Sequence, residues 1–454
     1  MRPCRPCRAY SLRRPNRPYG RPNIKRKIIR RLPEMEMEMR IPMHVVTEEV
    51  LTRMPAKSLL RFNWSEMPIP MHVVTNEILT RLPAKSLMRF KCVSKLWSSL
   101  ISSPYFRDRF LTVPTRQRPH LFMCLQDVND HSSSVTLSLV PDANSDDTPS
   151  SSSSFVVDLT IPRMRGGYIC QNLRGFMCYD LWQKPRIFNP ATRQLVTLPP
   201  AFNPNTTKGT VSYYFGHDPI TNQYKVVCSV GVRLTDTQEV RSHHRVFVLK
   251  PGGGGSWRKA YRLPPPDFIP HIAAIGGVCI NGVIYYLGWT AADSCMLVSF
   301  HIRSHDFKMI QVPLPEELPP PAKMKNVCLV EYGGKVTVVD QTSLRDKGRL
   351  DLWALEDAAN QKWSSKRLIV KPSQLEFVRN TELVIKGTSR NGKVFLIPTD
   401  LVSPFQILCY DLQSNHMIKI DIKGVPDHWF SKDKSTVEVM LMDHSETLMS
   451  LMNT

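Results

Sequence analysis

The sequence lacks the short patterns that most often mark an enzyme or a metal site. Its 454 residues contain no G-x-S-x-G, H-E-x-x-H or D-x-D-x-D-G, the patterns of a nucleophile elbow, a zinc protease and a calcium loop. The 11 cysteines include one C-x2-C pair, Cys4 with Cys7, and no second pair follows it. Because a structural zinc site needs four ligands, this pattern does not support one. We therefore expect no catalytic residue, no metal and no cofactor.

A secretory signal and a clear membrane span are also missing. An odd number of cysteines without a signal peptide predicts reduced thiols and a place in the nucleus and/or cytoplasm. Only residues 272–289 are apolar enough to be tested as a span. Asn281-Gly282 divides this stretch into two β-branched and aromatic runs, and Asn-Gly between apolar runs favours a tight hairpin. We predict a buried β-hairpin there and no contact with a membrane.

Acidic residues are absent from the first 33 positions, which hold ten Arg and two Lys. This tail carries +12 of the formal net charge of +21, so the other residues carry +9. A basic protein suggests a nucleic-acid partner, but the concentration of charge in one tail makes that partner unlikely for the rest of the chain. We expect residues 1–40 to form a disordered basic tail. A nuclear address at Lys25-Arg26-Lys27 and a transit peptide are the alternatives.

An internal repeat follows the tail. Residues 41–62 match residues 69–90 at eighteen of 22 positions. The first copy ends at Phe62 and lacks the Val-Ser-Lys-x-Trp segment that follows the second copy. We interpret residues 41–66 as a partial duplicate and residues 67–112 as the functional unit.

Apolar spacing predicts three or four short helices in residues 67–112. Val74, Ile78, Leu79 and Leu82 form the stripe of a first helix, and Pro83 is placed where a second helix begins. The later apolar residues continue the period until Ser103-Pro104. A unit of about 40 residues rarely buries enough surface by itself, so we expect a partner to cover part of its apolar surface.

This unit resembles an F-box. The matching elements are L-x-R-L-P at residues 79–83, K-S-L at residues 85–87 and V-S-K-x-W at residues 93–97. The resemblance implies docking on a Skp-type adaptor and, through it, on a cullin-RING ubiquitin ligase. The residues expected to contact the adaptor are Pro70, Ile78, Leu79, Leu82, Pro83, Leu87, Phe90, Val93 and Trp97. For each of them a place in the small internal core is the alternative, and we expect it most for Val93 and for Leu100.

Residues 113–454 show the pattern of an all-β domain, in which short apolar runs are separated by turn residues. Residues 141–154 read as a mobile polar loop. Closing hairpins recur in residues 186–199, 246–264, 297–313, 352–372 and 407–420, at the uneven spacing of kelch-like propeller blades. Strands expected near residues 121–125, 134–139 and 436–442 could form one more blade from both ends of the chain. We predict an α+β multidomain protein in which a small all-α F-box of three short helices precedes a β-propeller, with six blades favoured.

The β region resembles the plant F-box-associated domain, type 3. The matching pieces are residues 188–192 (FNPAT), 215–227 (FGHDPITNQYKVV), 278–286 (VCINGVIYY) and 352–357 (LWALED). The resemblance implies a non-catalytic substrate-recognition subunit of an SCF-type ubiquitin ligase, with an unknown target protein bound by the propeller. The alternatives are a stand-alone protein- or carbohydrate-binding propeller, a nucleic-acid binder and an enzyme whose residues converge in the propeller channel.

Two further groups of residues receive structural interpretations. His243 and His244 are adjacent, and adjacent side chains of a strand point to opposite faces, so they cannot bind one metal ion together. Because the residues around them are polar, we expect a solvated loop there rather than a metal or phosphate site. Tyr213, Tyr214, Tyr285, Tyr286 and Trp289 are expected to pack in the core or on inner strands rather than around a ligand.

Overall fold

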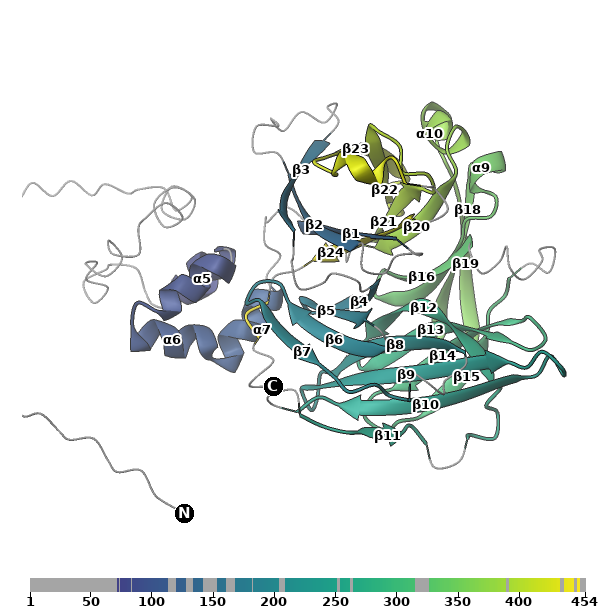
Figure 1. The fold of residues 1–454 in the computed structure, drawn as a ribbon, viewed down its shortest axis with the longest axis horizontal. Coiled ribbons are helices and arrows are strands. Elements are labelled where there is room, and N and C mark those ends of the chain that lie inside the picture. Colours follow the sequence, from purple (N-terminus) through teal and green to yellow (C-terminus); the bar gives the residue numbers. More distant parts are fainter. Residues whose placement is uncertain are drawn as a thin grey trace, which may run out of the picture.

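A computed structural model describes most of the chain from residue 72 onward. The described residues are 72, 74–82, 84–112, 120–127, 134–141, 153–160, 168–181, 183–203, 209–250, 254–261, 264–314, 326–388, 392–432, 437–444 and 447–449. The predicted tail and partial duplicate, residues 1–66, lie outside them, as do Pro70 and Pro83. A small helical unit comes first and a large array of β-sheets follows (Figure 1).

The helical unit contains three α-helices, α5 (Ala84–Lys91), α6 (Lys95–Ser102) and α7 (Pro104–Thr112). The first helix expected from the apolar stripe is instead a π-helical turn, η3 (Val74–Ile78), followed by a 3-10 turn, η4 (Leu79–Arg81). The hydroxyls of Ser94 and Ser103 accept hydrogen bonds from the backbone N–H of Trp97 and Phe106, both at 3.2 Å. These serines cap α6 and α7, which explains why the chain turns at both points.

Four of the sheets are regular antiparallel meanders of four strands. The first contains β4 (Tyr168–Leu173), β5 (Phe176–Leu181), β6 (Lys184–Asn189) and β7 (Gln194–Thr197). The second contains β8 (Thr210–Asp218), β9 (Gln223–Arg233), β10 (Val240–Val248) and β11 (Trp257–Lys259). The third contains β12 (His271–Ile280), β13 (Val283–Thr290), β14 (Cys295–His301) and β15 (Phe307–Gln311). The fourth contains β16 (Val327–Tyr332), β17 (Lys335–Asp340), β18 (Arg349–Asp357) and β19 (Lys362–Ile369).

The fifth sheet has eight strands and brings the two ends of the β region together. It contains β20 (Leu383–Thr388), β21 (Lys393–Pro398), β22 (Phe405–Asp411), β23 (His416–Lys423), β3 (Ser153–Thr160), β2 (Ser134–Pro141), β1 (His120–Asp127) and β24 (Val437–His444), in that order. Short helical segments α9 (Leu344–Lys347), η7 (Pro372–Gln374), α10 (Leu375–Arg379) and η8 (Asp427–Trp429) lie in the connections.

The expectation of six separate blades is not confirmed, because the described strands form five sheets. The strands predicted to close the array do meet, since β24 pairs with β1 and β1 with β2. They do not form a sheet of their own, because β3 pairs in parallel with β23 and so joins them to β20–β23. Two described residues of β3, Ser153 and Ser154, and Pro141 of β2 fall within the predicted mobile loop, and residues 142–152 lie outside the described part.

The predicted hairpin in residues 272–289 is confirmed. β12 and β13 pair in antiparallel register, and Asn281 and Gly282 form the turn with φ of 48° and 80°. Positive φ at both turn residues is what an Asn-Gly hairpin requires. Within the described ranges, no helix is long and apolar enough to cross a membrane.

Aromatic residues fill the spaces between sheets, as predicted for this group. Tyr214 of β8 stacks on Tyr286 of β13 with ring centroids 4.2 Å apart, and both rings are fully buried. Tyr213 and Trp289 are also buried, whereas Tyr285 packs at the edge of a core cluster. None of the eight cysteines whose side chains are described forms a disulfide.

The FGHDPITNQYKVV segment joins the second sheet to the third. Gly216 has no room for a Cβ atom, which would lie 2.5 to 2.7 Å from the side chains of Ile302 and Ile284. The buried carboxylate of Asp218 accepts hydrogen bonds from the Arg303 guanidinium at 3.2 Å and from the Thr221 hydroxyl at 2.7 Å. These donors hold the pKa of Asp218 well below its usual range. These hydrogen bonds connect two neighbouring sheets, and we call the connection between Asp218 and Arg303 the latch.

We predict that Asp218→Ala weakens this latch. The change leaves Arg303 and the β8–β9 turn without their acceptor, and hydrogen bonds to a charged group contribute about 1–3 kcal/mol. Urea unfolding of the full chain should therefore show a lower midpoint with an unchanged slope. Asp236→Ala, in the exposed β9–β10 turn, is the matched control, and an equal effect of both changes would contradict the latch.

Candidate functional site

Six of the nine residues expected to contact an adaptor lie together inside the helical unit. Ile78, Leu79, Leu82, Leu87, Phe90 and Trp97 are each 2% exposed or less and belong to one core cluster. The rings of Phe90 and Trp97 meet edge to face with centroids 5.7 Å apart. This burial favours the internal-core alternative for all six. Their packing holds the helices in place and so determines which other side chains are exposed. Pro70 and Pro83 lie outside the described residues, and the structure tests no contact with an adaptor, so the docking role stays a prediction.

Val93 and Leu100 are at the edge of this core and not at its centre. Both are only partly buried, which corrects the expectation that they are the most internal members of the set. Leu96 and Leu100 are four positions apart on α6, whereas Val93 lies in the turn before this helix. Leu96 itself is 60% exposed, whereas Trp97 and Ile101 are buried on the neighbouring side.

One large apolar side chain, Leu96, thus remains open at α6, with the partly buried Val93 and Leu100 at the edge of the core. We call Val93, Leu96 and Leu100 the α6 strip. Tyr105, at the start of α7, is another large exposed side chain of the unit, at 63%. Leu96 and Trp97 are both apolar in the sequence. The sequence did not show that Trp97 would be buried and Leu96 exposed.

The helical unit sits against one end of the first β4–β7 sheet (Figure 1). The guanidinium of Arg174, in the β4–β5 turn, lies 3.2 Å from the carboxylate of Asp108 of α7. Ala191, in the β6–β7 turn, packs against the helical core. Turns between first and second strands, and between third and fourth strands, lie at the same end of an antiparallel meander. We call this end the helical face.

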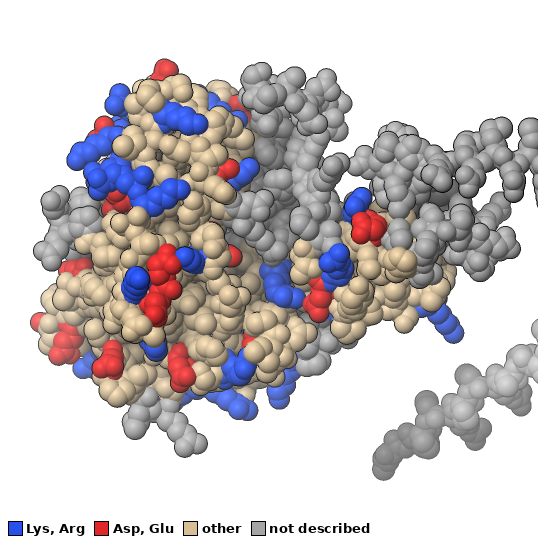
Figure 2. All heavy atoms as spheres, turned by 180° about the vertical axis from the view of Figure 1, so that it is seen from behind, with Lys and Arg blue, Asp and Glu red and all other residues tan. Residues whose placement is uncertain are grey.

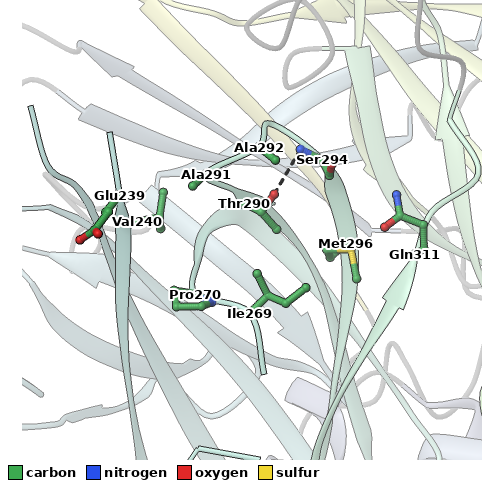
Figure 3. A pocket seen from close by; sticks show the side chains of 10 residues that line it. All are labelled: Glu239, Val240, Ile269, Pro270, Thr290, Ala291, Ala292, Ser294, Met296 and Gln311. Atoms are coloured by element: carbon green, nitrogen blue, oxygen red, sulfur yellow. Dashed lines mark hydrogen bonds between the residues drawn. The ribbon is translucent and has the colours of Figure 1, made fainter. Parts of the chain in front are cut away.

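A pocket of about 560 Å³ opens between turns of the second and third sheets (Figure 3). Its walls come from the β9–β10 turn, the β13–β14 turn and the segment before β12. The start of β14 and the end of β15 complete them. The lining residues are Glu239, Val240, Ile269, Pro270, Thr290, Ala291, Ala292, Ser294, Met296 and Gln311. The hydroxyl of Thr290 accepts a hydrogen bond from the N–H of Ser294 at 3.3 Å, which steadies one wall.

The pocket is mainly apolar, with one carboxylate, Glu239, among its lining residues. Turns between second and third strands lie at the end of a meander opposite to the helical face. The pocket and the helical unit therefore occupy different faces of the β array. Sequence reasoning did not find this pocket, because its residues come from separate turns and share no motif.

A buried polar network lies between the second and third sheets. The ring nitrogen Nε2 of His244 is 3.0 Å from the Ser229 hydroxyl and 3.2 Å from the Tyr286 hydroxyl. Nε2 of His271 is 3.1 Å from the same Tyr286 hydroxyl. The expectation of a solvated loop is wrong for His244, because β10 carries His244 inward and its neighbour His243 toward solvent. A period of two along a strand produces this alternation.

This network resembles a serine–histidine pair, but it is closed to solvent. Ser229, Tyr286 and His271 are all 0% exposed and His244 is 4% exposed. Burial lowers the pKa of His271 to about 4 and lowers the pKa of His244 well below its ordinary value. These four side chains are closed to solvent, so the arrangement supports packing between the two sheets. In the described part of the chain, no group of three or more acidic, histidine or cysteine side chains is placed to hold a metal ion.

Charged side chains are mixed over the face seen in Figure 2. Lys and Arg are denser at the upper left, but Asp and Glu lie among them. Opposite charges also meet in ion pairs, since the carboxylate of Asp351 lies 2.8 Å from Arg349 and 2.8 Å from Arg367. This view therefore shows no continuous basic stripe of the kind that tracks a nucleic-acid backbone.

Two family profiles match this chain, and together they cover most of it. The profile for the F-box domain matches residues 64–109, and the profile for the F-box associated beta propeller domain matches residues 120–445. The F-box/LRR-repeat protein At2g40920 of Arabidopsis thaliana is 42% identical over 80% of this chain and 83% of its own length. The F-box protein At4g19940 of the same plant is 42% identical over 90% of this chain and 92% of its own length.

We predict that acid weakens the fold through the buried histidines. The unfolded state binds protons near pH 6.5, whereas folded His271 binds them only near its pKa of about 4. The free energy of unfolding should therefore be level above about pH 6.5 and fall as the pH decreases toward about 4. Urea unfolding at a series of pH values measures this slope.

The control variants separate the two histidine environments. His271→Gln should flatten the slope between about pH 6.5 and pH 4. His416→Gln removes an exposed ring and should leave the slope as it is. A wild-type slope retained in His271→Gln would contradict this assignment.

Proposed function

The chain belongs to the F-box proteins that carry an F-box associated beta propeller domain, and from that premise we propose that it is the substrate-recognition subunit of an SCF-type ubiquitin ligase. The helical unit would dock on a Skp-type adaptor and, through it, on a cullin. The propeller would bind the target protein. The chain would break and form no bonds itself, but would raise the effective concentration of target lysines near the transferring enzyme.

The α6 strip is the observation that carries the docking proposal. Leu96 leaves 60% of its surface open on a unit whose other large apolar residues are mostly internal. We propose that the adaptor covers Leu96, with the partly buried Val93 and Leu100 at the edge of the contact. We propose that the buried residues Leu82, Phe90 and Trp97 act indirectly, by holding α6 in place.

The target would bind on the face that carries the pocket. The helical unit packs against turns of the β4–β7 sheet, whereas the pocket is formed by turns of the second and third sheets, so a target at the pocket would not compete with the adaptor. The mainly apolar lining favours an apolar side chain of the target, and the Glu239 carboxylate favours a neighbouring basic one.

Two finer points complete the proposal. The eight-stranded sheet would act as two blades of four strands, β20–β23 and β24-β1-β2-β3, in a ring of six. Thiols without disulfides in the described ranges favour a reducing compartment, so we propose a place in the nucleus and/or cytoplasm.

The test is co-purification of the full chain with a Skp-type adaptor, beside a Leu96→Asp variant. An added charge in a covered apolar surface should weaken adaptor binding by about tenfold or more, which is about 1.4 kcal/mol. Val402→Asp makes the same exchange at a propeller residue that is 51% exposed and should bind like the wild type. Failure of the folded wild type to bind the adaptor would refute the docking proposal. A fully active Leu96→Asp variant would refute the α6 strip.

A second substitution distinguishes core residues from contact residues. Trp97→Ala removes a large buried side chain and should cost about 3–5 kcal/mol of stability in the helical unit. Its loss of adaptor binding should be accompanied by a loss of helical circular dichroism, whereas Leu96→Asp should keep the helical signal. Equal loss of the helical signal in both variants would contradict the separation of the two roles.

A further inference from the structure

The segment Thr447–Met449 lies between the helical unit and the β4–β7 sheet (Figure 1). All three residues are buried, with exposed fractions of 0%, 5% and 4%. They follow β24, which is held against β1 in antiparallel register. The C-terminal part of the chain is therefore anchored on the β array before it reaches the helices.

Neighbouring side chains of this segment belong to two different cores. Leu448 belongs to the helical core, together with Phe106 and Phe110 of α7. Met449 belongs to the β core, together with Phe176 and Tyr224. The Tyr224 hydroxyl donates to the sulfur of Met449 at 3.0 Å. One short segment thus adds a side chain to each core.

The amide of Asn189 connects this segment to the β6–β7 turn. Its Nδ2 donates to the carbonyl oxygens of Thr447 at 3.3 Å and Met449 at 2.8 Å. Its Oδ1 accepts from the backbone N–H of Ala191 at 3.0 Å and Thr192 at 3.2 Å. Asn189 is 0% exposed, so both ends of the amide are used inside the protein.

Equivalent turns in other sheets show what is special about Asn189. Asp357 in the β18–β19 turn and Asp411 in the β22–β23 turn accept the same pair of backbone N–H bonds. A carboxylate suffices to cap this turn. The first sheet has an amide at this position, and its extra N–H group is the one that binds the C-terminal segment.

The other described contacts across the boundary are smaller. The ion pair between Asp108 and Arg174 is partly exposed, and exposed pairs contribute little. Ala191 and Leu111 each reach the edge of the opposite core. The C-terminal segment supplies the buried apolar and hydrogen-bonded contacts.

We infer that Thr447–Met449 is an interdomain joint that holds the helical unit in one orientation on the propeller. The pocket face is then presented at a constant angle and distance from the α6 strip. This consequence for target presentation rests on the proposed function, whereas the joint itself does not.

The test measures one distance in the full chain by pulsed electron–electron resonance. One spin label is placed on Cys92, which is exposed in the helical unit, and the other on a cysteine introduced at exposed Asp236 in the β9–β10 turn. Cys4, Cys7 and Cys124 are changed to Ser so that they do not react. The otherwise wild-type chain should show a single narrow distance distribution.

Two variants should broaden this distribution. Leu448→Asp places a charge in the helical core, and Asn189→Asp keeps the oxygen that caps the turn but removes the amide donor. Asp411→Asn makes the reverse exchange in an equivalent turn that makes no described contact with the helical unit and should leave the distribution narrow. If Leu448→Asp does not fold, Leu448→Ala replaces it.

Adaptor co-purification keeps the two proposals apart. Broadened distances in Asn189→Asp with adaptor binding retained would support the joint. Narrow distances in both folded variants would overturn it, whatever the adaptor does. A wild-type chain that shows narrow distances but binds no adaptor would overturn the proposed function and leave the joint intact.

Discussion

β24 and β1 lie at opposite ends of the β region in sequence and pair along eight residues, and the arrangement of the whole molecule depends on this ladder. A meander of sheets leaves unpaired backbone groups at its two ends. The ladder pairs β1 with β24 and so joins the last strand to the first, and β24 becomes the edge strand of the sheet. It also returns the C-terminal part of the chain to the helical unit, where Leu448 and Met449 complete two separate cores.

The direction of the strands then separates the helical face of the β array from the face that carries the pocket. Alternate turns of a meander lie at opposite ends, so the turns that contact α7 cannot be those that form the pocket. Under the proposed function, an adaptor and a target would bind at once and would need two surfaces that do not compete. The β array provides them by its connectivity alone, with the α6 strip beside one face and the pocket on the other.

Buried polar groups in this protein mark the places where separate elements are joined. Asp218 connects the second sheet to the third through Arg303. His244, His271 and Tyr286 form another connection between the same two sheets. Asn189 connects the first sheet to the C-terminal segment. A buried polar group without a partner is costly, so each of these side chains specifies one arrangement of the elements around it.

Local patterns in the sequence determined the identity of most elements. The apolar spacing and the capping residues Ser94 and Ser103 place the helices, and the Asn281-Gly282 turn places a hairpin, because these signals act between residues close in the chain. The F-box and propeller resemblances were carried by such local motifs and are confirmed by the family profiles.

Only the tertiary structure decided which side of each element is buried and which distant residues meet. Trp97 and Leu96 are adjacent and both apolar, yet one is in the core and the other is open, because packing against α5 and α7 selects one side of α6. The parallel pairing of β3 with β23, the inward turn of His244 and the contact of Asn189 with Met449 depend on residues far apart in sequence. Periodicity along the chain contains no information about those partners.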